Sequence, residues 1–143
     1  MKKINLSFNK EINDIKINLN SSKSESNRLL IIKYLSKNKI ELQNLSNAND
    51  TLLLANLLSK DSNEIWDAED AGTTYRFLAS YLALKKENIN LIGTERMKKR
   101  PIKILVDSLN KLGAKIYYLE KKGYPPITIK NKISQVSNSI SVK

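Results

Sequence analysis

Two kinds of apolar segment alternate along this 143-residue chain, and their order limits the folds that it can adopt. In one kind, apolar residues recur at every second position, which predicts a strand; in the other they recur at helical spacing. The segments follow the order strand, helix, strand, helix, strand, strand, with a faint internal repeat. This order is typical of an α/β domain built from repeated supersecondary units.

The same pattern sets the bounds of each expected element. Strands are predicted over Ile4–Phe8, Ile12–Leu19, Ile40–Leu45, Asn63–Ala68, Asn88–Ile92, Lys115–Leu119, Ile127–Ile129 and Ser134–Val142. Helices are predicted over Lys23–Lys37, Asp50–Leu58, Thr74–Leu84, and from Arg100-Pro101 to Gly113. Asn49 or Asp50 is the expected cap of the second helix. Pro101 is expected at the first position of the fourth helix and Gly113 just after its end.

The composition indicates a folded domain. Hydrophobic residues make up 41% of the chain and charged residues 27%, which are globular values. No apolar run reaches the roughly 18 residues that span a bilayer, and the basic start at Met1 lacks the apolar stretch of a signal peptide. The chain has no Cys and no His, which excludes a disulfide, a thiolate metal site and a histidine base. We therefore expect a cytoplasmic protein with no metal site and no membrane contact.

The net charge of +11 raises the question of nucleic-acid binding. The positive charges are 21 Lys and 4 Arg, and no basic stripe is interleaved with aromatic side chains that would stack on bases. We therefore expect no nucleic-acid partner. The four arginines, Arg28, Arg76, Arg96 and Arg100, each lie beside an expected helix start. A planar guanidinium fork at such a place suits a carboxylate or a phosphate.

The first helix start is the stretch "SSKSESNRLL", which begins at Ser21. Ser22 and Glu25 have the spacing of a capping box, and this local structural role is one interpretation. The other is anion binding, because a helix start offers free N–H groups and the positive end of the helix dipole. Lys23 and Arg28 would then approach one anion from two sides, and Ser24 would add a hydroxyl donor.

The second helix start is "AGTTYRF", which begins at Ala71. Gly72 allows the backbone to approach a ligand closely, Thr73 is a cap or donor, and Arg76 follows in the first turn. The alternative is structural: Gly72 permits a turn, and Arg76 pairs with one of the carboxylates of Asp67, Glu69 and Asp70.

The third helix start is the cationic run "ERMKKRP", from Glu95 to Pro101. A run of this kind is usually a solvated loop. However, a helix N-terminus repels cations, so four positive charges there lower the stability unless an anion binds. Three cationic helix starts in one small domain predict a multiply charged anionic ligand.

Three stretches of this chain, "SKSESNRLL", "DAGTTYRF" and "GTERMKKRPIKILVDSLNKLGAKIYYLEKKGYPPITIK", together resemble the 5-enolpyruvylshikimate-3-phosphate synthase family of enolpyruvyl transferases. The match runs in the right order from about Leu19 to Lys130. It implies a fold of two domains, each with three βαβαββ units, of which residues 1–143 form an N-terminal portion. Residues 1–20 would be opening strands that pack with the second domain, and residues 21–143 about two units of one domain. We therefore expect the chain to be part of a longer protein.

The resemblance implies a set of shikimate 3-phosphate contacts in the first stretch. Lys23 is similar to the family lysine that contacts both shikimate 3-phosphate and phosphoenolpyruvate. Ser24 and Arg28 resemble contacts of shikimate 3-phosphate. The chain departs from the family nearby, because Asn20-Ser21 stands where the family usually has Pro-Gly, and this departure bears on the loop before Lys23.

A second set of implied contacts binds phosphoenolpyruvate. Gly72 resembles the family's backbone contact, and Arg100 resembles the arginine that holds this substrate. Thr73 and Arg76 are implied as supporting residues. Here too the chain departs from the family, with Asp70 in place of a commoner Asn and Phe77 in place of a frequent Pro.

The implied activity is transfer of the enolpyruvyl group of phosphoenolpyruvate to the 5-hydroxyl of shikimate 3-phosphate, without metal or organic cofactor. The family's serine-and-glutamine motif and its proton-transfer residues have no counterpart before Lys143. We therefore expect no catalytic residue within this chain, no turnover by it alone, and a monomeric full-length enzyme. The alternative is a non-catalytic anion-binding fragment. The related UDP-N-acetylglucosamine enolpyruvyl transferases use a reactive cysteine, which this chain lacks.

Overall fold

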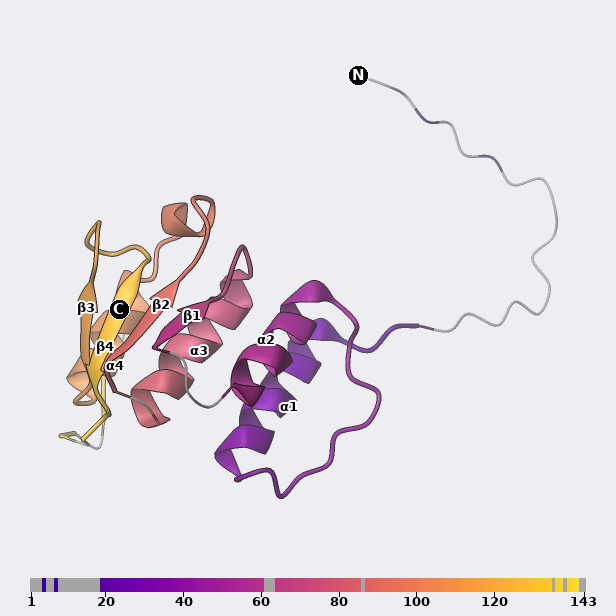
Figure 1. The fold of residues 1–143 in the computed structure, drawn as a ribbon, viewed down its shortest axis with the longest axis horizontal. Coiled ribbons are helices and arrows are strands. Elements are labelled where there is room, and N and C mark those ends of the chain that lie inside the picture. Colours follow the sequence, from indigo (N-terminus) through magenta and orange to yellow (C-terminus); the bar gives the residue numbers. More distant parts are fainter. Residues whose placement is uncertain are drawn as a thin grey trace.

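The C-terminal part of the chain forms a four-stranded mixed sheet, shown by the computed structural model in Figure 1. The structure describes residues 4, 7, 19–60, 64–85, 87–134, 136–137 and 139–141. The strands are β1 (Ile65–Asp67), β2 (Ile89–Ile92), β3 (Lys115–Tyr118) and β4 (Ile127–Asn131), in the order β1-β2-β4-β3. β1 and β2 are parallel, and the other two neighbouring pairs are antiparallel.

Two helices cover one face of this sheet (Figure 1). Helix α3 (Gly72–Lys85) connects the two parallel strands, and α4 (Lys103–Lys111) connects β2 to β3. Two neighbouring parallel strands need such a crossover, because the chain must return to the end of the sheet where the first strand began before the second can run in the same direction. Leu78 of α3 meets Leu91 and Ile127 of the sheet in a core where all three are fully buried. Residues 65–131 therefore form one βαβαββ unit, and the expected α/β class is confirmed.

Two further helices, α1 (Lys23–Leu35) and α2 (Asn49–Ser59), pack against each other and against α3. They lie beyond α3, on the side away from the sheet (Figure 1). Leu30 of α1 and Leu54 of α2 are buried in the common core. Helix α3 is thus the shared wall between the sheet and the α1–α2 pair.

The connection between α1 and α2 differs from the expectation. Residues 36–48 contain no strand, so the prediction of a strand over Ile40–Leu45 is wrong. Asn44 has a positive φ of 53°, which interrupts an extended backbone. Leu42 and Leu45 instead pack on the core as partly buried side chains of an irregular segment. The alternating pattern here marks burial without strand pairing.

The starts of α2 and α4 differ from those that the local sequence signals predict. Helix α2 begins after Ala48, which makes no side-chain cap, so neither Asn49 nor Asp50 is its cap. Helix α4 begins only at Lys103, two residues after Pro101, because Ile102 at its start still has a non-helical backbone. Gly113, which follows α4 with a φ of +102°, confirms the predicted end of that helix.

Both ends of the chain carried strand predictions. The two opening strands, Ile4–Phe8 and Ile12–Leu19, lie almost entirely outside the described residues. Residues 134, 136–137 and 139–141 form no strand, and the rest of the predicted Ser134–Val142 strand lies outside the description. Among the described residues, no helix is both long enough and apolar enough to cross a membrane.

Candidate anion-binding site

A polar pocket of about 470 Å³ opens where the starts of α2 and α3 meet the loop between β2 and α4. Its volume is in the range of small-ligand sites. Three cations line it: Lys23 from the first position of α1, and Arg96 and Arg100 from the loop. The other lining residues are Asn49, Asp50 and Leu53 of α2, and Glu69, Asp70, Ala71, Gly72 and Thr73 around the start of α3.

Two helix N-termini contribute backbone donors to this pocket. The helical hydrogen bonds of α3 begin with Tyr75 N–H donating to Ala71 O at 2.8 Å, so the N–H groups of Gly72 and Thr73 precede them. At α2 the corresponding bond is from Leu52 N–H to Ala48 O at 3.1 Å. The Thr74 hydroxyl donates to Asp50 O at 2.9 Å and holds the two helix starts together. Two positive dipole ends therefore lie at one pocket, which favours an anion.

Lys23 reaches the same pocket from α1. Its Nζ lies 3.3 Å from Asp50 Oδ2, and both side chains remain partly exposed, at 46% and 26%. An ion pair this exposed contributes only about 0.2–1 kcal/mol. Lys23 is therefore held at the pocket by a weak partner, which an incoming anion can replace.

Arg100 lies directly against Gly72. A Cβ atom on Gly72 would collide with Arg100 Nη1, and it would lie 3.1 Å from Arg76 Nη1. The Arg100 guanidinium thus occupies the space that a side chain at position 72 would need. Gly72 allows close approach, as the sequence indicated, but here to a side chain of the protein.

The cationic run before α4 is divided by the fold. Lys98 in the 3-10 turn η1 (Met97–Lys99) pairs with Glu120 at 2.8 Å and Glu95 at 2.9 Å. These hydrogen bonds, first that of Glu120, raise the pKa of Lys98. Lys99 is exposed, and only Arg96 and Arg100 line the pocket. The run precedes α4 by a turn, so the predicted crowding of these charges at that helix start is wrong.

The carboxylates of Asp50, Glu69 and Asp70 also line the pocket, and the last two belong to the turn before α3. Glu69 has a left-handed backbone, with φ of 48°, and its N–H donates to Asp67 Oδ1 at 2.8 Å. The Thr94 N–H donates to Glu69 O at 3.3 Å, and the Thr94 hydroxyl donates to Asp70 Oδ1. Thr94 therefore ties the start of α3 to the loop that carries Arg96 and Arg100.

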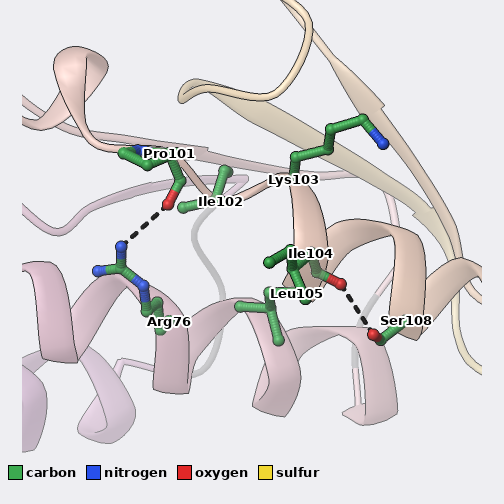
Figure 2. A pocket seen from close by; sticks show the side chains of 7 residues that line it. All are labelled: Arg76, Pro101, Ile102, Lys103, Ile104, Leu105 and Ser108. Atoms are coloured by element: carbon green, nitrogen blue, oxygen red, sulfur yellow. Dashed lines mark hydrogen bonds between the residues drawn. The ribbon is translucent and has the colours of Figure 1, made fainter. Parts of the chain in front are cut away.

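Arg76 makes contacts that differ from the structural alternative proposed for it. Its Nη1 donates to Gly72 O and its Nη2 to Pro101 O, both at 3.0 Å. Figure 2 shows the second of these bonds, with the guanidinium pointing from α3 to the Pro101 carbonyl. The expected pairing with the acidic side chains nearby is wrong, because the fork bridges two carbonyls instead.

The first turn of α1 confirms the cap but not a complete phosphate site. Glu25 N–H donates to Ser22 Oγ at 3.3 Å, as the capping box predicts. Arg28 Nη1 donates to Ser24 O at 3.1 Å, which directs the arginine toward the start of its helix. Ser24 and Arg28 are exposed and do not line the polar pocket. Their contact with a second ligand stays a prediction.

A second pocket, of about 440 Å³, lies beside α4 (Figure 2). Arg76 and Pro101 line it together with the run Ile102–Leu105 and with Ser108. Its walls are mostly apolar, and Ser108 Oγ is already bonded to Ile104 O at 2.8 Å. This pocket has little to offer an anion. Among the described residues, no group of three His, Cys, Asp or Glu side chains is placed to hold a metal ion.

The structure thus brings together Lys23, Gly72, Thr73 and Arg100 among the predicted residues, and leaves Ser24 and Arg28 apart. The sequence predicted no ligand contact at the start of α2, and it placed Arg96 only within the cationic run before the fourth helix. Asn49 directly precedes an expected helix start, and a helix start is the signal that indicated the other two places. The sequence predicts only a cap at this place, because the neighbouring Asp50 adds a negative charge and no cation.

Comparisons with known proteins agree on one family. The family model of EPSP synthase (3-phosphoshikimate 1-carboxyvinyltransferase) matches residues 56–143, which is more than half of the chain. A 3-phosphoshikimate 1-carboxyvinyltransferase of Bacteroides fragilis is 45% identical over 116 residues, covering 81% of this chain and 28% of the relative. A relative of the same name from Histophilus somni is 52% identical over 66 residues, covering 44% of this chain and 15% of the relative.

A solved structure shows the same fold. The EPSP synthase of Acinetobacter baumannii superimposes with a TM-score of 0.70 at 18% identity, covering 83% of this chain and 32% of that one. The chain therefore spans less than a third of the length of the Bacteroides relative, and about a third of the solved structure. The family match, the identity over most of this chain and the common fold lead to one assignment. The chain belongs to the EPSP synthase family.

Proposed function

We propose that this chain supplies the N-terminal substrate-binding part of a shikimate-pathway transferase in the cytoplasm. The complete enzyme would move the enolpyruvyl group of phosphoenolpyruvate to the 5-hydroxyl of shikimate 3-phosphate. The observation that carries the proposal is the polar pocket, where two helix N-termini and three cations gather in a chain of this family. Both substrates are phosphorylated, and such a pocket suits a phosphate or a carboxylate.

Within the pocket, each residue has a distinct role in binding phosphoenolpyruvate. The Arg100 guanidinium holds an anionic group by two parallel hydrogen bonds, and Lys23 adds a point charge from the start of α1. The backbone at Gly72 donates N–H groups from the start of α3, where Thr73 supports them. Arg96 is a further cation at the rim of the pocket.

Shikimate 3-phosphate would bind at the start of α1, where the side chains of Lys23, Ser24 and Arg28 are exposed. Lys23 would then be shared by the two substrates, since it begins α1 and also lines the polar pocket. This arrangement is supported by the Arg28–Ser24 bond, which keeps the guanidinium near the helix start. Residues outside this chain would complete the site.

The pocket provides anion binding but no matched proton donor and acceptor. Among its lining carboxylates, Asp50 pairs with Lys23 and Asp70 accepts from the Thr94 hydroxyl. Enolpyruvyl transfer requires the attacking hydroxyl to lose a proton, and the methylene carbon of phosphoenolpyruvate to gain one and then lose one as phosphate leaves. We propose that the groups for these steps lie elsewhere in a monomeric full-length enzyme, that no metal or organic cofactor takes part, and that nucleic acid is not a partner.

Substitution of Arg100 tests the assignment. In the 143-residue chain, Arg100→Ala is expected to weaken phosphoenolpyruvate binding about tenfold or more, since a charge-assisted hydrogen bond contributes about 1.5–3 kcal/mol. Binding is measured by NMR titration of backbone amides. The unfolding midpoint of the ligand-free protein should hardly change. A large loss of stability instead would assign Arg100 a structural role and contradict the proposal.

The alternative, a non-catalytic anion-binding fragment, is favoured by the same pocket and needs a different measurement. The purified chain should show no enolpyruvyl transfer by itself, because one open half leaves its cations in bulk water. Mixing it with the separately expressed remainder of a relative should restore turnover if the chain is part of a transferase. Binding without any restored turnover, although both pieces are folded and associated, would favour the alternative.

A further inference from the structure

Arg76 is the charged residue whose contacts the proposed function leaves unexplained. It does not line the polar pocket, but it bonds to Gly72, which does, and to Pro101, the residue after Arg100 of that pocket. We infer that Arg76 is a positioning residue, which sets the separation between the Gly72 backbone and the Arg100 guanidinium. This inference rests on the proposed binding of phosphoenolpyruvate in the polar pocket.

The geometry supports this role in three steps. The first is the bond from Arg76 Nη1 to Gly72 O, at 3.0 Å, within the first turn of α3. The second is the bond from Nη2 to Pro101 O, also at 3.0 Å, on the residue that follows Arg100. The third is the close approach of Arg100 to Gly72, which leaves no room for a Cβ atom. One guanidinium therefore joins the two backbone segments whose spacing defines the pocket.

The residue type matters because of its shape. The guanidinium is a rigid planar fork, so two carbonyls bonded to it cannot move independently. A lysine at the same place would keep the charge but would bring one small ammonium group with freely rotating donors. Both bonds of Arg76 go to neutral carbonyls, so they do not consume its charge in an ion pair. The two hydrogen bonds therefore depend more on the planar shape of the guanidinium than on its charge.

The separation that Arg76 sets should matter for one class of ligand. Phosphoenolpyruvate carries two anionic groups, a phosphate and a carboxylate, and can contact the start of α3 and Arg100 at the same time. Inorganic phosphate has one group and needs only one of these contacts. If the spacing between Gly72 and Arg100 becomes less rigid, binding of phosphoenolpyruvate should therefore weaken much more than binding of inorganic phosphate. The reason is that the ligand must then order two separate contacts, which costs conformational entropy on binding.

The first measurement is made without ligand on the 143-residue chain. NMR relaxation of the Arg100 Nε–Hε group reports how firmly that side chain is held. Arg76→Lys and Arg76→Gln are expected to increase its motion on the picosecond-to-nanosecond timescale. Lys99→Gln is the matched control, because it removes an exposed charge from the same loop without touching either carbonyl. It should leave the Arg100 motion unchanged.

The second measurement compares two ligands. Arg76→Lys should weaken phosphoenolpyruvate about tenfold and inorganic phosphate no more than about twofold, which is a difference of at least about 1 kcal/mol. Lys99→Gln should weaken both ligands slightly and equally. Salt titrations then separate the charge effect from the positional effect.

Each possible outcome supports or overturns the positioning role of Arg76. Unchanged Arg100 motion in both Arg76 variants would overturn the inference, as would equal weakening of the two ligands. Unfolding of both variants would overturn it as well, because Arg76 would then be a residue of the general fold. If the unsubstituted chain binds phosphoenolpyruvate no better than phosphate, the proposed function fails, and the Arg100 relaxation alone decides the role of Arg76.

Discussion

The sheet unit (residues 65–131) and the α1–α2 pair (residues 23–59) are held in place by different forces. In the sheet unit, neighbouring strands are joined by backbone hydrogen bonds, and α3 packs on them. The α1–α2 pair has no strand among its described residues and depends on side chains packed against α3. A few polar bonds add to this, such as that from Ser46 N–H to Ser26 Oγ at 2.9 Å.

The polar pocket draws on both regions. Gly72, Thr73, Arg96 and Arg100 belong to the sheet unit, whereas Lys23 and the start of α2 belong to the helix pair. The difference between the regions therefore bears directly on binding. A change within the sheet unit alters the position of Arg100, and a change within the pair alters how closely Lys23 approaches it.

The largest expected effects come from cavities in the two cores. Leu91→Ala in β2 and Leu54→Ala in α2 each empty a fully buried site, and each should lower the free energy of unfolding by about 2–5 kcal/mol. Hydrogen exchange should distinguish them. Leu91→Ala should reduce protection throughout, and Leu54→Ala mainly in α1 and α2. Equal loss of protection in β2 and β4 with Leu54→Ala would show that the two regions unfold as one.

An intermediate effect is expected at the contact between Gly72 and Arg100. In Gly72→Ala the new methyl group would push the guanidinium away, because it would occupy the same space. The far end of a long side chain moves easily, and alanine favours a helix over glycine by about 1 kcal/mol. The ligand-free protein should therefore be as stable as before or slightly more so, while phosphoenolpyruvate binding weakens several-fold.

Thermal unfolding and an NMR titration of the same sample check both parts of this prediction. Thr73→Ser is a suitable control, since it keeps the hydroxyl at the start of α3 and adds no bulk. If Gly72→Ala bound the ligand normally, Arg100 would not need its present position.

The smallest effect concerns the ion pair between Lys23 and Asp50, which lies within the α1–α2 pair at the edge of the pocket. Asp50→Asn removes the carboxylate partner of Lys23, at a cost in stability of about 0.2–1 kcal/mol. Because a negative charge leaves an anion pocket, inorganic phosphate should bind about two- to threefold more tightly. Calorimetric titration at low ionic strength measures this change. Weaker binding would instead mean that Asp50 is needed to orient Lys23.

The sheet unit could be predicted from the sequence because its signals are local and agree. Alternating strands, the helix over α3 and the turn glycine Gly113 all appear at nearly the predicted bounds. The segment 40–45 could not be predicted, since its apolar alternation is equally compatible with single side chains that pack on a core. Whether such a segment pairs depends on neighbours far away in the chain.

The candidate site shows the same limit. Local signals at helix starts, cations at Lys23 and Arg100 and a glycine at Gly72, predicted three residues that line the pocket, because each signal lies within a few residues. The convergence of α2 with α3 depends on tertiary contacts such as that of Thr74 with Asp50 O, which no spacing reveals. The bridge from Arg76 to Pro101 O spans 25 positions in the chain and is invisible for the same reason.

The position of the pocket across two regions couples ligand binding to folding by mass action. An anion that contacts Lys23 on one side and Arg100 on the other binds only when the α1–α2 pair is docked, so it acts as a removable crosslink. At a concentration of about 100 times its dissociation constant, such a ligand adds about 2.7 kcal/mol to the docked state. A bound anion would then increase the fraction of molecules in which the helix pair is docked on α3.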